Sequence, residues 1–216
     1  MIASGGEKSL NSDLGIAGTV KRAGVIGLQG DVSEHIDSLQ RALRSVHEEG
    51  EVLWIRRRDD LERVDCVVLP GGESTTISKL LVKFDLHDLL RKRGEEGMPI
   101  LGTCAGMIVL CQRGGDQVER TGTRLLGLLE AEVDRNAFGR QRESFETDLV
   151  VEGLDSPLHA VFIRAPAIIR TWGECRPLAR VGEHVVMVRQ GNIMAASFHP
   201  ELTDDLRVHR MLLDMV

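Results

Sequence analysis

The chain has 216 residues, of which 42% are hydrophobic and 28% are charged, as expected of one globular domain with a substantial core. Its formal net charge is -6 without a long run of like charges, which argues against nucleic acid as the main partner. No apolar run approaches the ~20 residues that cross a bilayer, so we do not expect a membrane-spanning protein. No apolar leader is present and the four cysteines lack CxxC spacing, so we expect a cytoplasmic protein.

Residues 1–20 are rich in glycine, serine and other polar residues, and we expect them to form an N-terminal extension outside the core. Residues 21–216 are predicted to form one domain, whose first half alternates short apolar strands with helices. This alternation is typical of a parallel sheet with helices on both faces, a three-layer α/β sandwich. Strands are expected at 23–28, 51–55, 64–69 and 99–101, and helices at 33–49, 60–63, 74–84, 87–96 and 105–112.

A different pattern begins after Gly127, where shorter strand-like runs follow one another. Such runs, without helices between them, favour antiparallel or mixed pairing in the second half. The sequence therefore predicts one α/β domain with a mostly parallel central sheet. In this half strands are expected at 129–133, 147–151, 160–164, 185–189 and 193–196, and a last helix at 204–215.

The segment Gly102-Thr103-Cys104-Ala105-Gly106 joins an expected strand to an expected helix. It resembles the nucleophile elbow G-x-S-x-G with cysteine in place of serine, a tight turn that presents the nucleophile at the carboxyl edge of the sheet. The helix start would favour the thiolate of Cys104, and the N–H of Ala105 would face an oxyanion formed there. A structural cysteine buried at a glycine-rich turn is the alternative. Cys66 and Cys111 are expected in the core, within an apolar strand and a helix.

A thiol nucleophile needs a base and a group that orients the base, and Ser197-Phe198-His199-Pro200-Glu201 offers both. In an extended segment, side chains at i and i+2 face the same side, so His199 and Glu201 are expected to point together while Pro200 stiffens the segment. Alone, a His-x-Glu pair is weak evidence, and the cysteine elbow strengthens it. The other histidines are expected on the surface: His35, His47, His87, His159, His184 and His209.

Two further loops follow expected strands at the same edge of the sheet. In Gly71-Gly72-Glu73-Ser74, the N–H of Gly72 would complete an oxyanion hole, and Glu73 would meet a polar substrate. Ser74 or Thr75 would cap the next helix, and a flexible turn with only this capping role is the alternative. After Gln29-Gly30-Asp31, either Asp31 or Ser33 is a candidate cap for the following helix.

With these residues the chain resembles a known family. The Cys104 turn and His199-Pro200-Glu201 resemble the class I, triad-type glutamine amidotransferases, whose fold is flavodoxin-like. Other stretches are similar to a narrower family, the glutaminase subunits of pyridoxal 5′-phosphate synthase, and the similarity runs from about Ala23 to the end of the sequence. These stretches are GLQGDVSEH at 27–35, LPGGESTT at 69–76, RNAFGRQ at 135–141, SFE at 144–146 and FIRAP at 162–166.

The resemblance implies hydrolysis of L-glutamine to L-glutamate and ammonia by Cys104, His199 and Glu201, with Gly72 and Ala105 as the oxyanion hole and without a cofactor or metal. It also implies a separate synthase subunit that takes up the ammonia and organises the oxyanion loop, so the chain alone is expected to be weakly active. Carried over to this sequence, glutamine recognition falls on Gly72, Glu73, Ser74, Arg135, Ile163 and Arg164.

The two arginines suit the α-carboxylate of an amino acid, which a guanidinium grips with paired donors. The alternatives are a surface loop residue for Arg135 and a strand-end ion pair for Arg164. The N-terminal extension and the long, charged segment 113–124 depart from the family pattern.

Two other functions compete with this interpretation. A glutaminase of another pathway is disfavoured by RNAFGRQ and FIRAP, and a non-catalytic regulatory protein on the same scaffold is disfavoured by the complete triad.

Overall fold

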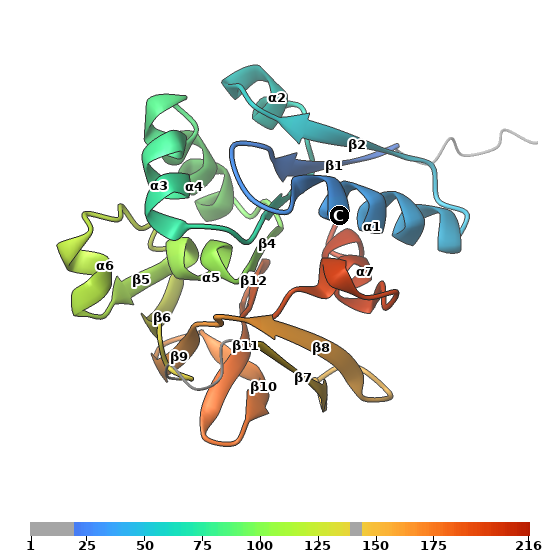
Figure 1. Cartoon of the computed structure of the whole chain (residues 1–216). Helices are drawn as coiled ribbons and strands as arrows, with labels where there is room; N and C mark the ends of the chain where they lie inside the picture. The colour runs from blue at the N-terminus through green and yellow to red at the C-terminus, as the bar shows by residue number, and fades with distance from the viewer. Residues whose placement is uncertain (1–19, 139–143) are drawn as a thin grey trace, which may run out of the picture.

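A central sheet of ten strands runs through the molecule, with a separate sheet of two strands beside it (Figure 1). The computed structural model describes residues 20–138 and 144–216. The expected extension at 1–19 and the segment 139–143, which includes the end of the RNAFGRQ stretch, lie outside the described residues. Within the described ranges no helix is both long enough and apolar enough to cross a membrane.

The elements follow the expected alternation in the first half and the expected run of strands in the second. The strands are β1 (Lys21–Ile26), β2 (Gly50–Ile55), β3 (Cys66–Leu69), β4 (Ile100–Thr103), β5 (Cys111–Gly114), β6 (Leu129–Asp134), β7 (Ser144–Leu149), β8 (Leu158–Ile163), β9 (Ala167–Thr171), β10 (Arg176–Val181), β11 (His184–Gln190) and β12 (Ile193–Ala196). The helices are α1 (Val32–Ser45), α2 (Arg58–Glu62), α3 (Ser74–Lys83), α4 (His87–Glu95), α5 (Ala105–Leu110), α6 (Asp116–Arg120) and α7 (Arg207–Leu213), with a 3-10 turn, η1, at Pro200–Leu202.

The large sheet is parallel on one side and mixed on the other. Its order is β2-β1-β3-β4-β12-β11-β9-β6-β5, and β10 pairs with β11 off this path. The pairs from β2 to β12 are parallel, whereas β12, β11, β9 and β6 pair antiparallel in turn. The predicted α/β fold with a mostly parallel sheet is therefore confirmed. The last parallel strand, β12, lies beside β4 although the two are far apart in the sequence.

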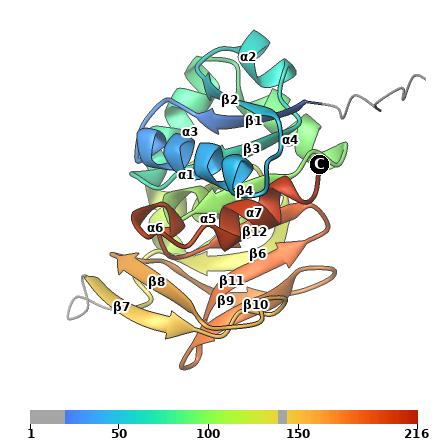
Figure 2. The same ribbon diagram turned by 90° about the vertical axis from the view of Figure 1, so that its right-hand side faces the viewer.

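Helices cover both faces of the parallel half, because its strands are apolar on both faces (Figure 2). In β3, Val67 and Leu69 belong to the core shared with α3 and α4, whereas Cys66 and Val68 belong to the core shared with α1 and α7. All four side chains are buried, and each such burial stabilises the fold by about 2 kcal/mol. The continuous apolar run in the sequence is thus a consequence of two cores that share one sheet.

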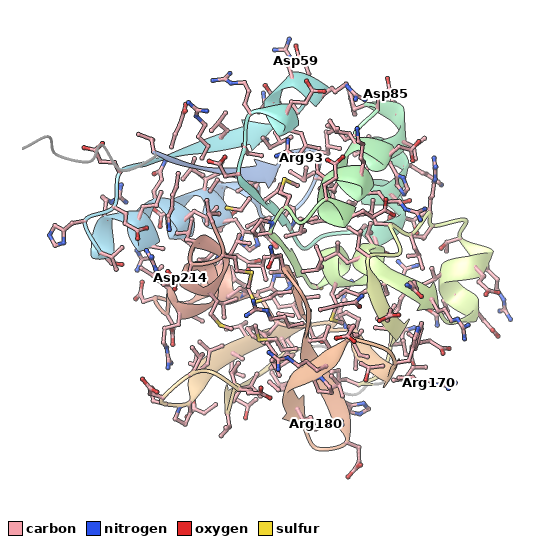
Figure 3. All side chains as sticks on the ribbon, turned by 180° about the vertical axis from the view of Figure 1, so that it is seen from behind. Asp59, Asp85, Arg93, Arg170, Arg180 and Asp214 are labelled. Atoms are coloured by element: carbon pink, nitrogen blue, oxygen red, sulfur yellow. The ribbon has the colours of Figure 1, made fainter. Side chains whose placement is uncertain are left out.

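Charged side chains lie at the periphery of the fold. Figure 3 labels Asp59, Asp85 and Arg180, which lie at the outside of the ribbon and are exposed. Arg93, also labelled, is half-buried and donates from its guanidinium to the carbonyls of the last two residues of α2 and, at 2.8 Å, to that of Val64. This arginine fastens α4 to the loop that precedes β3.

The charged segment 113–124 has more structure than the sequence indicates. The helix expected at 105–112 ends at Leu110, and the chain continues as β5, which pairs in parallel with β6. The side chains of Gln112 and Arg113 are exposed, so this strand has no apolar run to predict it. Cys111 is buried as expected, but in a strand instead of a helix.

Candidate active site

The nucleophile candidate lies on a sharp turn between β4 and α5. Cys104 has φ 46° and ψ -104°, a backbone conformation that non-glycine residues rarely adopt and that stores strain. Gly106 has no room for a side chain, because a Cβ there would lie 2.0 Å from the carbonyl oxygen of Leu69. The glycine therefore lets the turn pack directly against the end of β3. Cys104 as a whole is 8% exposed, and its Sγ lies 3.9 Å from the carbonyl oxygen of Ile163.

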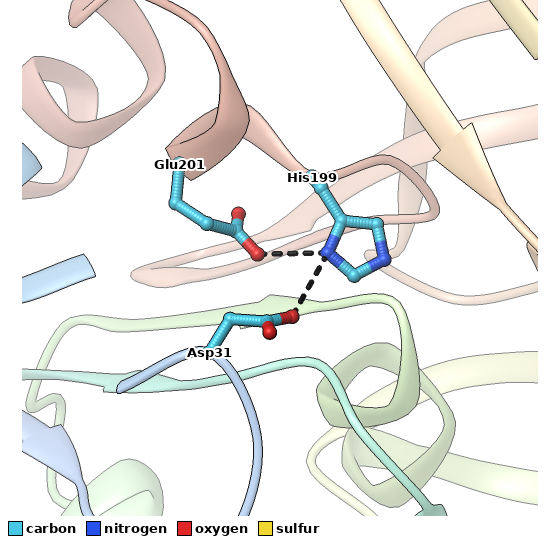
Figure 4. Close-up of side chains that lie close together, drawn as sticks. All are labelled: Asp31, His199 and Glu201. Carbon is cyan, nitrogen blue, oxygen red and sulfur yellow. Dashed lines mark hydrogen bonds and ion pairs between the residues drawn. The ribbon is translucent and has the colours of Figure 1, made fainter. Parts of the chain in front are cut away.

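The base candidate and its carboxylate come from the segment after β12. Nδ1 of His199 lies 2.8 Å from Oε1 of Glu201, and both residues are buried (Figure 4). The expected extended geometry is wrong, however, since Pro200 begins the 3-10 turn η1 and Glu201 lies within it. The turn brings residues i and i+2 together, so the predicted contact forms on a different backbone. The backbone N–H of His199 also donates to the carbonyl of Val161 in β8 at 2.9 Å.

The carboxylate of Asp31, a candidate cap for α1, faces the same imidazole. Asp31 makes no side-chain cap to α1, and its Oδ2 lies 3.4 Å from Nδ1 of His199 (Figure 4). The signal for this contact is the position of Asp31 after β1, at the carboxyl edge of the sheet that also holds the Cys104 turn. The donor atoms of Asp31, His199 and Glu201 lie within 4.8 Å of one another, close enough to share a cation. Because Glu201 already binds Nδ1, the cluster is explained by orientation of the imidazole.

The electrostatics of the site favour a protonated imidazole. Burial opposes the charge on His199, but hydrogen bonds to Cys104 and Glu201 and their negative charges outweigh it and raise the pKa of His199 to about 10. Burial also raises the pKa of Glu201 against the opposing effect of His199, and the charge of Asp31 adds to the rise. An imidazolium next to the sulfur of Cys104 is the form that stabilises a thiolate.

The other three cysteines differ from Cys104 in their surroundings. Burial raises the pKa of Cys66 to about 12 and that of Cys175 to about 11, and it raises the pKa of Cys111 as well. All four cysteines of the chain are free thiols. The three with raised pKa values stay protonated at neutral pH, which fits the core positions expected for Cys66 and Cys111.

The loop between β3 and α3 lies against the same site. Gly72 has φ 136°, and a Cβ added there would lie 2.5 Å from Oε1 of Gln29. That oxygen accepts a hydrogen bond from the N–H of Glu73 at 2.9 Å, so Gln29 holds the loop. On the other side, a Cβ at Gly71 would be 2.7 Å from Cε1 of His199. Three loops at the carboxyl edge thus meet around the imidazole.

Glu73 caps α3, a role expected for its neighbours Ser74 or Thr75. Its carboxylate accepts from the N–H groups of Thr75 and Thr76, so Glu73 is the cap of α3, and the expected capping by Ser74 or Thr75 is wrong. Burial would raise the pKa of Glu73, but these hydrogen bonds and one from Arg135 lower it to about 2. Nη2 of Arg135 lies 2.9 Å from the Glu73 carboxylate.

The expected glutamine-binding residues fall into two groups. Glu73, Ser74 and Arg135 lie together at the start of α3, where the hydroxyl of Ser74 is buried and has no hydrogen-bond partner among the described residues. Ile163 and Arg164 lie at the end of β8, where the backbone of Ile163 faces Cys104. Arg164 is exposed and has φ 44°, another left-handed backbone conformation.

Three of the histidines expected on the surface are buried. His35 and His209 are 0% exposed and His87 is 2% exposed, whereas His47 and His159 are exposed as expected. The prediction fails because an imidazole can be buried where its ring nitrogens find partners inside the fold. His35 has a partner on each nitrogen, whereas His209 and His87 have a partner on one nitrogen only among the described residues. His35 and His209 touch each other, and His35 also faces Glu201.

Comparisons with known proteins identify the family of the chain. Residues 25–216 match the model of the SNO glutamine amidotransferase family. The chain is 48% identical over 195 residues to the pyridoxal 5′-phosphate synthase subunit PdxT of Methanosarcina barkeri, covering 90% of this chain and 98% of the relative. It is 50% identical over 193 residues to the subunit of the same name from Thermococcus onnurineus, covering 89% and 97%.

Solved structures are similar as well. A crystal structure described as a glutamine amidotransferase matches with a TM-score of 0.79 and 47% identity, covering 89% of this chain and 97% of that one. A glutamine amidotransferase from Thermotoga maritima, at 15% identity and a TM-score of 0.54, shares the fold. The resemblance noted in the sequence is confirmed, and the chain belongs to the SNO glutamine amidotransferase family.

Proposed function

We propose that this protein is the glutaminase subunit of a pyridoxal 5′-phosphate synthase, which hydrolyses L-glutamine to L-glutamate and ammonia. The observation that supports it best is the buried His199–Glu201 pair beside a cysteine on a strained strand-to-helix turn. The family match and the names of relatives that share about half of the residues point to the same activity and the same synthase.

In the first half of the proposed reaction, the sulfur of Cys104 attacks the carboxamide carbon of glutamine. The N–H groups of Ala105 and Gly72 stabilise the oxyanion. His199 then donates its proton to the leaving nitrogen, the C–N bond breaks, and ammonia departs from a thioester. The pKa of His199, raised to about 10, means that the imidazole holds this proton at neutral pH.

In the second half, the neutral imidazole of His199 takes a proton from water as the water oxygen attacks the thioester carbon. The C–S bond breaks, glutamate leaves, and Cys104 and His199 return to their starting forms. Glu201 holds Nδ1 throughout, so Nε2 is the nitrogen that exchanges protons.

Recognition of glutamine is assigned to Gly72, Glu73, Ser74, Arg135, Ile163 and Arg164. Without substrate, Arg135 and Glu73 pair with each other at 2.9 Å. The α-carboxylate and α-ammonium of glutamine are the complements of these two side chains, and we propose that both turn toward the amino acid when it binds. The buried hydroxyl of Ser74, without a partner among the described residues, is a further polar group for the substrate.

The ammonia is proposed to pass to a separate synthase subunit in a complex with this chain. Gly72, with its positive φ, lets the oxyanion loop reorient, and contact with the synthase is proposed to set the active conformation. The free thiols fit a reducing compartment, and we propose that the complex works in the cytoplasm without nucleic acid or membrane.

The test is ammonia release from L-glutamine by the purified chain, alone and with its cognate synthase subunit. We expect weak release alone and a strong rise with the synthase, and no release from Cys104→Ala under either condition. Cys175→Ala, which also removes a buried thiol, is the matched control and is expected to behave as the parent. Release near the parent rate from Cys104→Ala would exclude it as nucleophile. Strong release that the synthase leaves unchanged would favour a glutaminase of another pathway.

A further inference from the structure

Two buried histidines continue the line of polar contacts beyond Glu201. Oε2 of Glu201 is buried without a hydrogen-bond partner among the described residues, and it lies 3.3 Å from Nε2 of His35. The same Nε2 lies 3.1 Å from the hydroxyl of Thr103. Nδ1 of His35 lies 2.9 Å from Nε2 of His209. His35 comes from α1 and His209 from α7, the two helices that pack side by side over one face of the sheet (Figure 2). Neither ring is exposed, and the proposed reaction gives neither a role.

We propose that His35 and His209 are positioning residues for the reaction: His209 orients His35, and His35 donates its Nε2–H toward Glu201, which in turn holds His199. This inference rests on the proposed function. In this proposal each hydrogen bond has a defined donor: His209 donates to His35, and His35 donates toward Glu201. The same N–H of His35 also faces Thr103, the neighbour of Cys104.

The direction follows from which buried atoms have partners. Nδ1 of His209 is buried and has no hydrogen-bond partner in the described part of the chain. A bare ring nitrogen fits such a position better than an N–H, because buried N–H groups without an acceptor are rarer in folded proteins than buried acceptors that lack a donor. His209 therefore carries its proton on Nε2 and donates to Nδ1 of His35. The proton of His35 then lies on Nε2, facing the oxygens of Thr103 and Glu201.

The opposite tautomers would make two unfavourable contacts. With its proton on Nδ1, His35 would donate to Nε2 of His209, and His209 would leave an N–H buried at Nδ1. The bare Nε2 of His35 would also point a lone pair at the Glu201 carboxylate, 3.3 Å away. Only the proposed direction avoids both contacts.

Electrostatics favours neutral rings in both positions. Burial lowers the pKa of His35, and the neighbouring His209 and His199 lower it further. Burial alone lowers the pKa of His209 to about 4. The titratable groups that face His35 are His209 from α7, Glu201 from η1 and, more distantly, His199, while β4 contributes the uncharged Thr103. His35 is thus a neutral donor, able to hold a carboxylate whose pKa burial has raised.

The consequence concerns the charge and position of Glu201. One oxygen binds His199 and the other faces His35, so the carboxylate cannot rotate without breaking a contact. Oε2 is buried and has no hydrogen-bond partner among the described residues, so the N–H of His35 is the donor that we propose for it. Such a donor favours the ionised form, and this form stabilises the imidazolium of His199. Removal of the donor would raise the pKa of Glu201. On acidification, activity would then begin to fall at a higher pH than in the parent protein.

The kinetic test compares His35→Leu with His35→Gln in the presence of the cognate synthase subunit. Gln carries an N–H near the position of Nε2, so it can keep the donor that Leu lacks. For His35→Leu we expect kcat to fall by about 10- to 100-fold, the usual effect of losing a partner that orients a functional group, with KM within about threefold of the parent. In His35→Leu the fall of kcat/KM on the acidic side of the pH profile should move to higher pH. His35→Gln should restore, at least in part, both kcat and the pH at which this fall occurs.

His87→Leu is the matched control, because His87 is 2% exposed and lies on α4, away from Glu201. It is expected to keep the parent kcat and pH profile. The proposal is wrong if His35→Leu, correctly folded, behaves as His87→Leu does.

A second measurement does not depend on turnover. Long-range 1H–15N NMR spectra of the ligand-free protein at pH 7 report the tautomer of each histidine, with His209→Gln to assign the pair. We expect both His35 and His209 neutral and protonated on Nε2. A proton on Nδ1 of His35, or a charged ring in either position, would overturn the proposal even if the variants fail to fold. A parent protein without glutaminase activity would instead refute the proposed function, and the spectra would still decide the hydrogen-bond direction.

Discussion

Gly106→Ala tests whether the spacing between the Cys104 turn and the β3 loop sets the activity. The added Cβ would lie 2.0 Å from the carbonyl oxygen of Leu69 and 3.2 Å from that of Pro70, and no flexible side chain is available to move. To reach the 3.0 Å that real Cβ contacts keep, the two backbones must separate by about 1 Å. That shift pulls Cys104 away from Gly72 and opens the proposed oxyanion hole.

A displacement of about 1 Å in a catalytic group can cost on the order of 100-fold in rate, and overpacking of this kind destabilises a fold by about 1–3 kcal/mol. We therefore expect kcat/KM for ammonia release, with the cognate synthase subunit, to fall about 100-fold while the variant remains folded. Urea unfolding gives its stability. Gly115→Ala is the control, since a Cβ there would meet only the carbonyl of Val133 at 4.0 Å. A folded Gly106→Ala that retains the parent kcat/KM would refute the reasoning.

Three further predictions concern strain, pH and the cap of α3. Cys104→Gly should be about 1 kcal/mol more stable to urea than Cys104→Ala, because glycine accepts φ 46° without strain, and a less stable glycine variant would contradict a strained elbow. The pKa of His209 is about 4 in the folded chain and 6.5 ordinarily, so between pH 6.5 and pH 4 only the unfolded chain takes up the proton. We therefore expect this histidine to lower the free energy of unfolding by about 3 kcal/mol as the pH falls through that range. His209→Gln should flatten this slope in urea titrations between pH 7 and 5, and an unchanged slope would show that other groups cause it. Glu73→Ala should cost about 1 kcal/mol of stability through loss of the cap and should raise KM for glutamine, whereas an unchanged KM would remove Glu73 from substrate binding.

Sequence patterns predict the fold well where one local rule decides the structure. Strands buried on both faces, such as β3 and β12, appear as short continuous apolar runs. β5 and β10 do not, because exposed residues such as Gln112 and Arg113 interrupt the first and Pro177 lies near the start of the second. β5 pairs with β6, which begins at Leu129, so its pairing depends on a partner that no local pattern reveals. β10 pairs with β11 across the two-residue turn Gly182-Glu183, and the turn is a stronger local signal than the strand itself.

The candidate site shows the same division. Cys104 and His199 are predictable because each belongs to a short motif with a chemical purpose. The contact between His199 and Glu201 is predicted correctly on the wrong backbone, since two residues of separation are close in an extended segment and in a 3-10 turn alike. The burial of His35 and His209 is not predictable locally, because the two rings that satisfy each other are 174 residues apart in the chain.

The position of β12 in the sheet has a consequence for when the protein first becomes able to react. β12 pairs with β4 so that Ala196 lies beside Thr103, and this register sets the segment that holds His199 next to the turn that holds Cys104. Before β12 has left the ribosome, a nascent chain can form β1 to β4 and present the cysteine, but it has no base. Insertion of one late strand between β4 and β11 completes both the hydrophobic core and the chemistry, so a partly synthesised chain cannot release ammonia.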